Sequence, residues 1–283
     1  MLSVQRLKRE LKVNSDLTGL LDALKWIALA QFRLLQKKKE RFADFTEAFE
    51  GFFRIIDFGR VEHPFARGEG KLGIIMITSD EGFMGGLNSR VITAALGYPG
   101  AADAHLVILG ERGANFLRES GRQFVHFPGV TTEERYESAL KLKDYIIKEG
   151  LAGKFGRLVL FYAKPVSFTV QEVEAVKILP CGELFEKRKD MVSGTGDLII
   201  ESSINGIIEY LVGAWITERL FEILEDSKLS EFSARAVHLE ESHQVLEKRD
   251  REIKLQYFRS QHNLIDKGIR ETFSSQILRK EAV

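Results

Sequence analysis

The positions of the prolines and glycines constrain this chain more than any other feature. All five prolines lie between residues 64 and 180. Glycine follows the same distribution, because only Gly19 precedes residue 51 and only three glycines follow residue 196. Proline inside a helix costs about 3 kcal/mol, so both flanks are free to form long helices. We therefore expect a central domain that is rich in glycine and proline, over residues 70–200, between two helical arms over residues 1–58 and 203–283.

Apolar residues of the amino-terminal arm recur every seven positions, as in the seam of a coiled coil. The first line of the seam is Leu21, Ala28, Leu35, Phe42, Phe49 and Ile56. The companion line is Leu17, Leu24, Gln31, Lys38, Phe45 and Phe52. Asn14, Ser15 or Asp16 predicts a helix cap or a break near residue 15, because short polar side chains favour such positions.

The carboxy-terminal arm has the same period. Its apolar line is Phe232, Leu239, Leu246 and Ile253, and its more polar companion is Ala236, His243, Asp250, Tyr257 and Leu264. At about 1.5 Å per residue, an unbroken helix over 203–280 exceeds about 100 Å. Such an arm projects from its domain and pairs with the other arm or enters a partner. Because half of the seam is polar, pairing of two helices leaves surface for other contacts.

The central region alternates short apolar runs with helical patterns. Buried strands are predicted at 72–78, 105–110 and 157–162, and helices at 111–121 and 133–149. Residues 170–179 alternate apolar and polar side chains, which is typical of an edge strand. This order predicts an open α/β sheet with right-handed crossovers.

Composition excludes several classes of protein. Lys and Arg number 41, as do Asp and Glu, and this balance argues against a nucleic-acid-binding protein. A single cysteine, Cys181, excludes an internal disulfide and a multi-cysteine zinc site. The most apolar stretch, 204–216, carries Glu209 and is shorter than the roughly 20 residues of a membrane span. The sequence therefore predicts no membrane span. Its first residues, MLSVQRLKRELKV, contain no apolar run, which predicts no secretory leader.

The loop that follows the first strand is the strongest candidate for chemistry. Its candidate residues are Ser79, Asp80, Gly82, Gly85, Gly86 and Asn88. Glycine-rich loops before a helix can hold phosphate, but the GxGxxG spacing and the GK[ST] motif are absent here. The carboxylates of Asp80 and Glu81 would also repel a phosphate. Tight packing of strand on helix explains these glycines better than nucleotide binding.

Other candidates for a reactive site are weaker. His238 and His243 are five residues apart, not the four that a helical metal pair needs. Glu240 and His243 match one Glu-x-x-His motif, but a di-iron site needs two copies. Cys181 has no context that marks a nucleophile. We therefore expect no catalytic residue, no cofactor and no metal on this chain.

Three segments, taken in order, resemble the gamma subunit of F-type ATP synthases. Residues 77–88 read ITSDEGFMGGLN, where the family has roughly ITSDRGLCGGLN. Residues 230–239 read SEFSARAVHL and look like the family's SExxARMVAM. Residues 23–36 are similar to the family's amino-terminal helix. Glu81 stands where the family usually has Arg and Met84 where it usually has Cys, which indicates a divergent or alternate bacterial member.

The resemblance implies an antiparallel coiled coil of the two arms with an inserted Rossmann-like α/β domain. It further implies a central stalk that couples ion flow through the c-ring to ATP synthesis or hydrolysis. The partners would be the alpha and beta subunits of the hexamer, the epsilon subunit and the c-ring, at the cytoplasmic face of a bacterial inner membrane. The residues expected to form the shaft are Leu21, Leu24, Ala28, Phe232, Leu239 and Leu246. The candidate partner contacts are Arg33, Lys37, Arg235 and Gln261.

Two other classes of function stay open at this point. One is a small α/β enzyme with a coiled-coil arm for oligomerisation, which would bind nucleotide directly. The other is a coiled-coil scaffold, which would form a stable homodimer.

Overall fold

Two long helices, three shorter helices and one five-stranded sheet make up the part of the chain that the structure describes. The computed structural model describes residues 4–39, 68, 70–181 and 204–281. Compactness divides the chain into one unit of residues 1–27 with 236–283 and another of residues 28–235. The division falls inside both long helices, α1 (Val4–Lys39) and α8 (Ile204–Glu281). The domain boundaries at 58, 70, 200 and 203 stay a prediction.

The sheet has the strand order β3-β2-β1-β4-β5. Its strands are β1 (Leu72–Ile77), β2 (His105–Leu109), β3 (Val125–Phe127), β4 (Arg157–Pro165) and β5 (Gln171–Leu179). β1 pairs in parallel with β2 and β4, β2 pairs in parallel with β3, and β4 and β5 are antiparallel. All six residues of the central strand β1 are buried, as the uninterrupted apolar run predicts.

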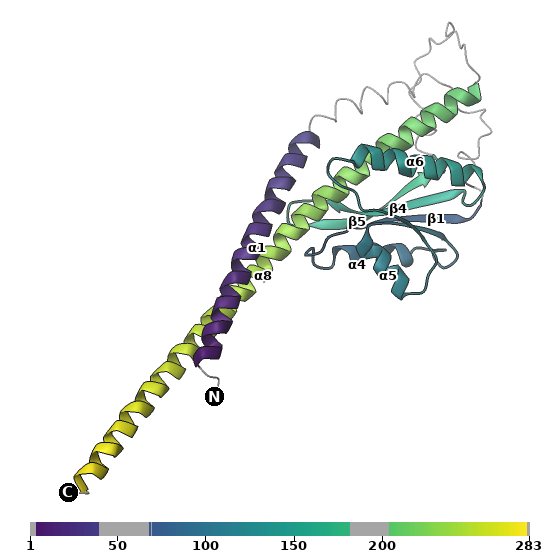
Figure 1. Ribbon diagram of the computed structural model, residues 1–283. Helices are drawn as coiled ribbons and strands as arrows, with labels where there is room; N and C mark the ends of the chain where they lie inside the picture. The colour runs from purple at the N-terminus through teal and green to yellow at the C-terminus, as the bar shows by residue number, and fades with distance from the viewer. Residues whose placement is uncertain (1–3, 40–67, 69, 182–203, 282–283) are drawn as a thin grey trace. The chain divides into compact units, whose positions relative to one another are not determined.

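Helices cover both faces of the sheet (Figure 1). On one face, α6 (Arg135–Leu151) and the first part of α8 pack against Ile75, Val107 and Leu160. On the other face, α4 (Leu87–Leu96) and α5 (Glu111–Glu119) pack against Ile74 and Ile108. Successive strand residues point to opposite faces, so two apolar cores form around one sheet.

The expected α/β fold with long helical arms is confirmed, and so is the edge position of the strand near residue 175. Two details differ from the sequence analysis. β3 was not expected, because it has three half-buried or exposed residues and no apolar run. The predicted break near residue 15 is wrong, since α1 continues through Asn14. The amino-terminal seam beyond Lys39 lies outside the described residues.

Candidate functional site

The first and last parts of the chain form a two-stranded antiparallel coil within one compact unit. Four contacts between side chains of α1 and atoms of α8 define its direction, because the residue number on α8 falls as that on α1 rises. They are Glu10 with Arg249 at 3.1 Å, Asn14 with the Leu246 carbonyl at 3.0 Å, Asp22 with His243 at 3.2 Å and Lys25 with Glu240 at 2.8 Å.

The buried line of α1 repeats every seven residues along the whole described helix. It consists of Leu7, Asn14, Leu21, Ala28 and Leu35, of which all but the half-buried Leu21 are buried. The companion line predicted from the sequence is wrong at Leu17, which is 45% exposed, and at Gln31, which is exposed. Partly buried residues lie instead four positions after the first line, at Leu11, Thr18, Lys25 and Phe32. Lys38 has no described side chain.

The predicted shaft residues lie on the inner side of their helices. Ala28, Phe232 and Leu239 are buried, and Leu21, Leu24 and Leu246 are half-buried. Ile253 extends the line of α8 by one more heptad and is also buried. The role of these residues in a rotating shaft stays a prediction.

A polar layer interrupts the apolar seam at Asn14. Its side chain is 6% exposed, and Nδ2 donates to the carbonyl oxygen of Leu246. A buried polar residue at one seam position favours the register that satisfies its hydrogen bonds and disfavours others. Asn14 therefore fixes the alignment of α1 on α8, a role that its sequence context did not reveal.

A charged cluster forms a second polar layer of the coil. Lys25 Nζ lies 2.9 Å from Asp22 Oδ1 and 2.8 Å from Glu240 Oε2, and His243 Nε2 lies 3.2 Å from Asp22 Oδ2. The hydrogen bond from Lys25 lowers the pKa of Asp22 and that of Glu240. The two carboxylates, Glu240 first, raise the pKa of Lys25. The cluster links α1 to α8 through opposite charges.

These shifts predict a pH-dependent contribution to stability. The carboxyl pKa values of Asp22 and Glu240 lie below their ordinary values of 3.8 and 4.5 in the folded chain, so the unfolded chain takes up protons first as the pH falls. The cluster therefore stabilises the coil fully above about pH 5, begins to lose this effect as the pH falls below 4.5 and 3.8, and loses it entirely below the lower pKa values of the folded chain. Lys25→Met should lower the midpoint of thermal unfolding by about 2 °C at pH 7 and by less at pH 3.

The measurement is circular dichroism of the full chain during heating at several pH values. Lys141→Met is the matched control, because Lys141 pairs with Glu137 on exposed surface of α6. A Lys25→Met effect of equal size at pH 7 and pH 3 would contradict the proposed linkage.

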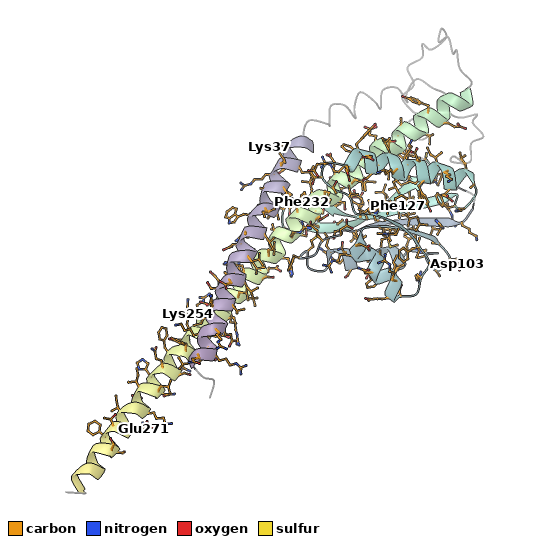
Figure 2. All side chains as sticks on the ribbon, in the orientation of Figure 1. Lys37, Asp103, Phe127, Phe232, Lys254 and Glu271 are labelled. Atoms are coloured by element: carbon orange, nitrogen blue, oxygen red, sulfur yellow. The ribbon has the colours of Figure 1, made fainter. Side chains whose placement is uncertain are left out.

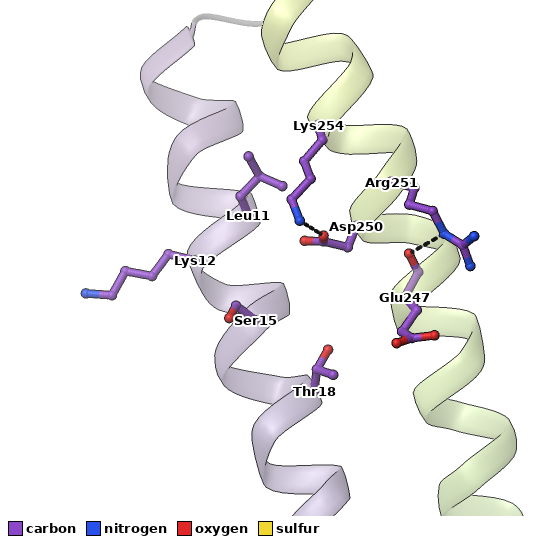
Figure 3. Close-up of a pocket in the computed structure, with 8 residues that line it drawn as sticks. All are labelled: Leu11, Lys12, Ser15, Thr18, Glu247, Asp250, Arg251 and Lys254. Atoms are coloured by element: carbon purple, nitrogen blue, oxygen red, sulfur yellow. Dashed lines mark hydrogen bonds and ion pairs between the residues drawn. The ribbon is translucent and has the colours of Figure 1, made fainter.

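A groove of about 740 Å³ lies between α1 and α8 beside Asn14, lined by residues 11–18 of α1 and 247–254 of α8 (Figure 3). The exposed Ser15 and the half-buried Thr18 line it on α1, and Glu247 and Asp250 line it on α8. Lys254 pairs with Asp250 at 2.6 Å on α8 itself. Polar side chains of both helices therefore line an open groove on this part of the coil.

The loop between β1 and α4 is held by its own polar side chains. Asp80 Oδ1 accepts hydrogen bonds from the backbone N–H of Glu111 at 2.8 Å and of Gly129 at 3.1 Å. Asn88 accepts from the backbone N–H of Ser79 and donates to the Ser79 hydroxyl at 2.8 Å. The motif residues thus fix the backbone at the carboxyl end of the central strand.

This geometry bears on the nucleotide-binding alternative. Glu111 is the first residue of α5, and a helix N-terminus attracts anions. The Asp80 carboxylate already occupies that position. Gly82, Gly85 and Gly86 belong to the same loop, where Gly85 has a φ of +58° that favours glycine. The loop therefore places the Asp80 carboxylate, and not a bound phosphate, at the N-terminus of α5.

The candidate partner contacts divide into two groups. Arg33, Lys37 and Gln261 are exposed. Arg235 is 8% exposed, and its guanidinium contacts Glu81 at 2.9 Å, Glu231 at 2.7 Å and the Gly82 carbonyl at 3.3 Å. These contacts favour a structural role for Arg235 inside the chain. The pairing with Glu81 was missed, although the unusual acid at position 81 was a signal for it.

Among the described residues, no group of side chains has the composition and arrangement of a metal site. None of the helices in the described ranges has a stretch that is both apolar and long enough to cross a lipid bilayer.

Comparison with known proteins agrees with the fold and the motifs. The model of the family described as ATP synthase matches residues 3–276. The ATP synthase gamma chain of Pelotomaculum thermopropionicum is 27% identical over 245 residues, which cover 83% of this chain and 84% of the relative. The gamma chain of Halothermothrix orenii is 25% identical over 280 residues, which cover 96% and 97%.

The solved structures show the same fold. A chain in the rotor of the Euglena gracilis mitochondrial ATP synthase aligns with a TM-score of 0.66 and 12% identity, over 93% of this chain and 98% of that chain. At this level of identity the likeness is one of fold. Together with the family match over residues 3–276, it shows that the chain belongs to the ATP synthase gamma-chain family.

Proposed function

We propose that this chain is the shaft of a rotary ATP synthase and that the end of α8 turns inside the hexamer of alpha and beta subunits. Ion flow through the c-ring would turn the chain, and the asymmetric shaft would favour a different conformation at each catalytic site in turn. In this proposal the sheet domain lies next to the epsilon subunit and the c-ring, at the cytoplasmic face of a bacterial inner membrane. The chain needs stiffness and asymmetry for this role, and no reactive group.

The observation that carries the proposal is the exposed end of α8. α1 begins at Val4, near the level of the buried Ile253, and α8 continues to Glu281 without α1 beside it (Figure 1). Between Lys254 and Ser275 nearly every side chain is exposed (Figure 2). This end of α8 has no described neighbour within its compact unit, which favours a partner around it.

The exposed end has one apolar face. At 100° per residue, five large apolar side chains fall within an arc of about 80°. They are Leu255, Phe258, Ile265, Ile269 and Phe273, and each is more than half exposed. A contiguous apolar stripe on exposed surface marks an interaction site. We call these five residues the apical stripe.

The first experiment is a pull-down of the tagged chain from its native membranes in mild detergent, with ATPase activity assayed on the eluate. Co-elution of alpha and beta subunits with ATP hydrolysis is the expected result. An isolated chain that binds nucleotide in calorimetry would favour the enzyme alternative, and a stable homodimer would favour the scaffold.

A variant of the apical stripe tests where the contact lies. Ile265→Asp with Ile269→Asp should reduce recovery of the alpha and beta subunits about tenfold or more, because two isoleucines that become buried against a partner together contribute about 3 kcal/mol or more. Asn263→Asp with Ser274→Asp is the matched control, since the pair adds the same two charges at exposed positions on another face of the helix. Equal recovery with both variants would place the contact elsewhere.

A further inference from the structure

A row of alternating charges runs along α8 and ends in the motif loop. Lys228 Nζ lies 2.7 Å from Glu231 Oε2, and Glu231 Oε1 lies 2.7 Å from Arg235 Nη2. The same nitrogen of Arg235 lies 2.9 Å from Glu81 Oε2. The row therefore passes from the helix to the loop through a single guanidinium.

Burial differs sharply along this row. The side chains of Glu231 and Arg235 are each 9% exposed, whereas that of Glu81 is 72% exposed. A buried guanidinium is stable only when charged or polar groups contact it. Arg235 meets this need by bridging two elements, since Nε also donates to the Gly82 carbonyl.

The loop that Arg235 reaches follows the central strand β1 and is hydrogen-bonded to two helices. Asp80 bonds the first turn of α5, and Ser79 bonds Asn88 of α4. Between Asp80 and Asn88, Phe83 has a φ of +63°, a strained conformation for a residue with a side chain. Such a residue persists only where neighbouring contacts hold it. A force on this loop therefore reaches the strands and α5.

The same side of this turn of α8 also contacts α1. Phe232 is buried against Leu229 and against Leu35 of α1. Lys228 and Arg235 lie over the Phe232 ring at 5.7 and 6.0 Å. Within this compact unit, α1, α8 and the motif loop therefore meet around residues 228–235.

We propose that Glu81 and Arg235 form a latch that holds the motif loop against α8, so that a turning force on α8 reaches the sheet domain. Both are positioning residues, and the proposal rests on the proposed shaft function. The ion pair depends on the acid at position 81. The arginine that the family usually has there would place a second guanidinium beside Arg235 and could not form the pair. The latch uses one exposed carboxylate to orient one buried guanidinium.

The experiment compares Glu81→Gln, Glu81→Asp and wild type in the complex purified from native membranes. Glu81→Gln should lower the number of ions pumped per ATP hydrolysed about two- to fivefold. Amide hydrogen exchange in residues 79–86 should become about fivefold faster, because the loop opens more often when its tie to α8 is weaker. Glu81→Asp keeps the charge and should remain close to wild type in both readouts.

A second readout separates the latch from a general loss of stability. Glu81 is mostly exposed, so Glu81→Gln should shift the midpoint of thermal unfolding by less than about 2 °C. The matched control is Glu119→Gln, which removes an exposed carboxylate at the end of α5.

Two outcomes would overturn the latch. One is a Glu81→Gln complex with wild-type pumping and wild-type exchange. The other is a loss of pumping that Glu119→Gln shares or that follows a lower unfolding midpoint. A wild-type complex that hydrolyses ATP without pumping ions would contradict the shaft function instead, and exchange in residues 79–86 would still decide whether the latch exists.

Discussion

Gly110→Ala should destabilise the sheet domain by about 3–5 kcal/mol, a large part of the stability of an ordinary domain. Gly110 lies between β2 and α5 with a φ of +96°. A Cβ at this position would lie 2.5 Å from the carbonyl oxygen of Thr78. Both the backbone conformation and the space at this position therefore require glycine.

Thr78 has little freedom to move away from such a methyl group. Its backbone N–H and its hydroxyl both donate to the carbonyl of Leu109, the residue before Gly110. The Gly110 N–H in turn donates to the Phe127 carbonyl at 3.0 Å. Relief of the clash would break the contacts that join β1, β2 and β3 at their carboxyl ends, next to Asp80.

Gly121→Ala is the matched control. Gly121 also has a positive φ, +68°, but a Cβ there would have no neighbour within 4 Å. It should cost only about 1–2 kcal/mol, the strain of the left-handed conformation. Urea unfolding of the full chain, followed by circular dichroism, measures both changes as shifts of the midpoint. Equal shifts would show that the contact with Thr78 is not the cause.

The second large effect is expected from Ala236→Pro. Ala236 is 3% exposed and lies in the interior of α8, which continues through both compact units. Proline there removes one backbone hydrogen bond and clashes with the carbonyl of Phe232, at a cost of about 3 kcal/mol or more. A kinked α8 would no longer act as a stiff shaft, so ATP hydrolysis should continue while ion pumping falls about tenfold or more.

The measurement is made in inverted membrane vesicles, with ATP hydrolysis and formation of the ion gradient recorded on the same sample. Ala236→Gly is the control, because glycine costs a helix only about 1 kcal/mol and leaves the hydrogen bond in place. Co-purification of the alpha and beta subunits shows whether each variant assembles. An assembled Ala236→Pro complex that pumps as well as wild type would contradict the shaft proposal.

Local sequence patterns predicted most of the architecture. The absence of proline from both flanks and the seven-residue spacing of Phe232, Leu239 and Ile253 identified the long helices, because helix geometry places such residues on one face. The apolar run at 72–77 predicted a buried central strand for the same local reason. The three short motifs, taken in order, identified the family.

Only the tertiary structure decided which residues meet. Lys25 and Glu240 are 215 positions apart, and Arg235 and Gly82 are 153 apart, so no local period relates them. The companion line of α1 was misassigned because both spacings, three and four residues, lie on one side of a helix. Packing against α8 decides which of the two spacings is buried. β3 was missed because it has only three residues and forms through pairing with β2, not through an apolar pattern of its own. Periodicity determines which face of an element is buried, whereas the contacts across that face depend on where the rest of the chain places its partner.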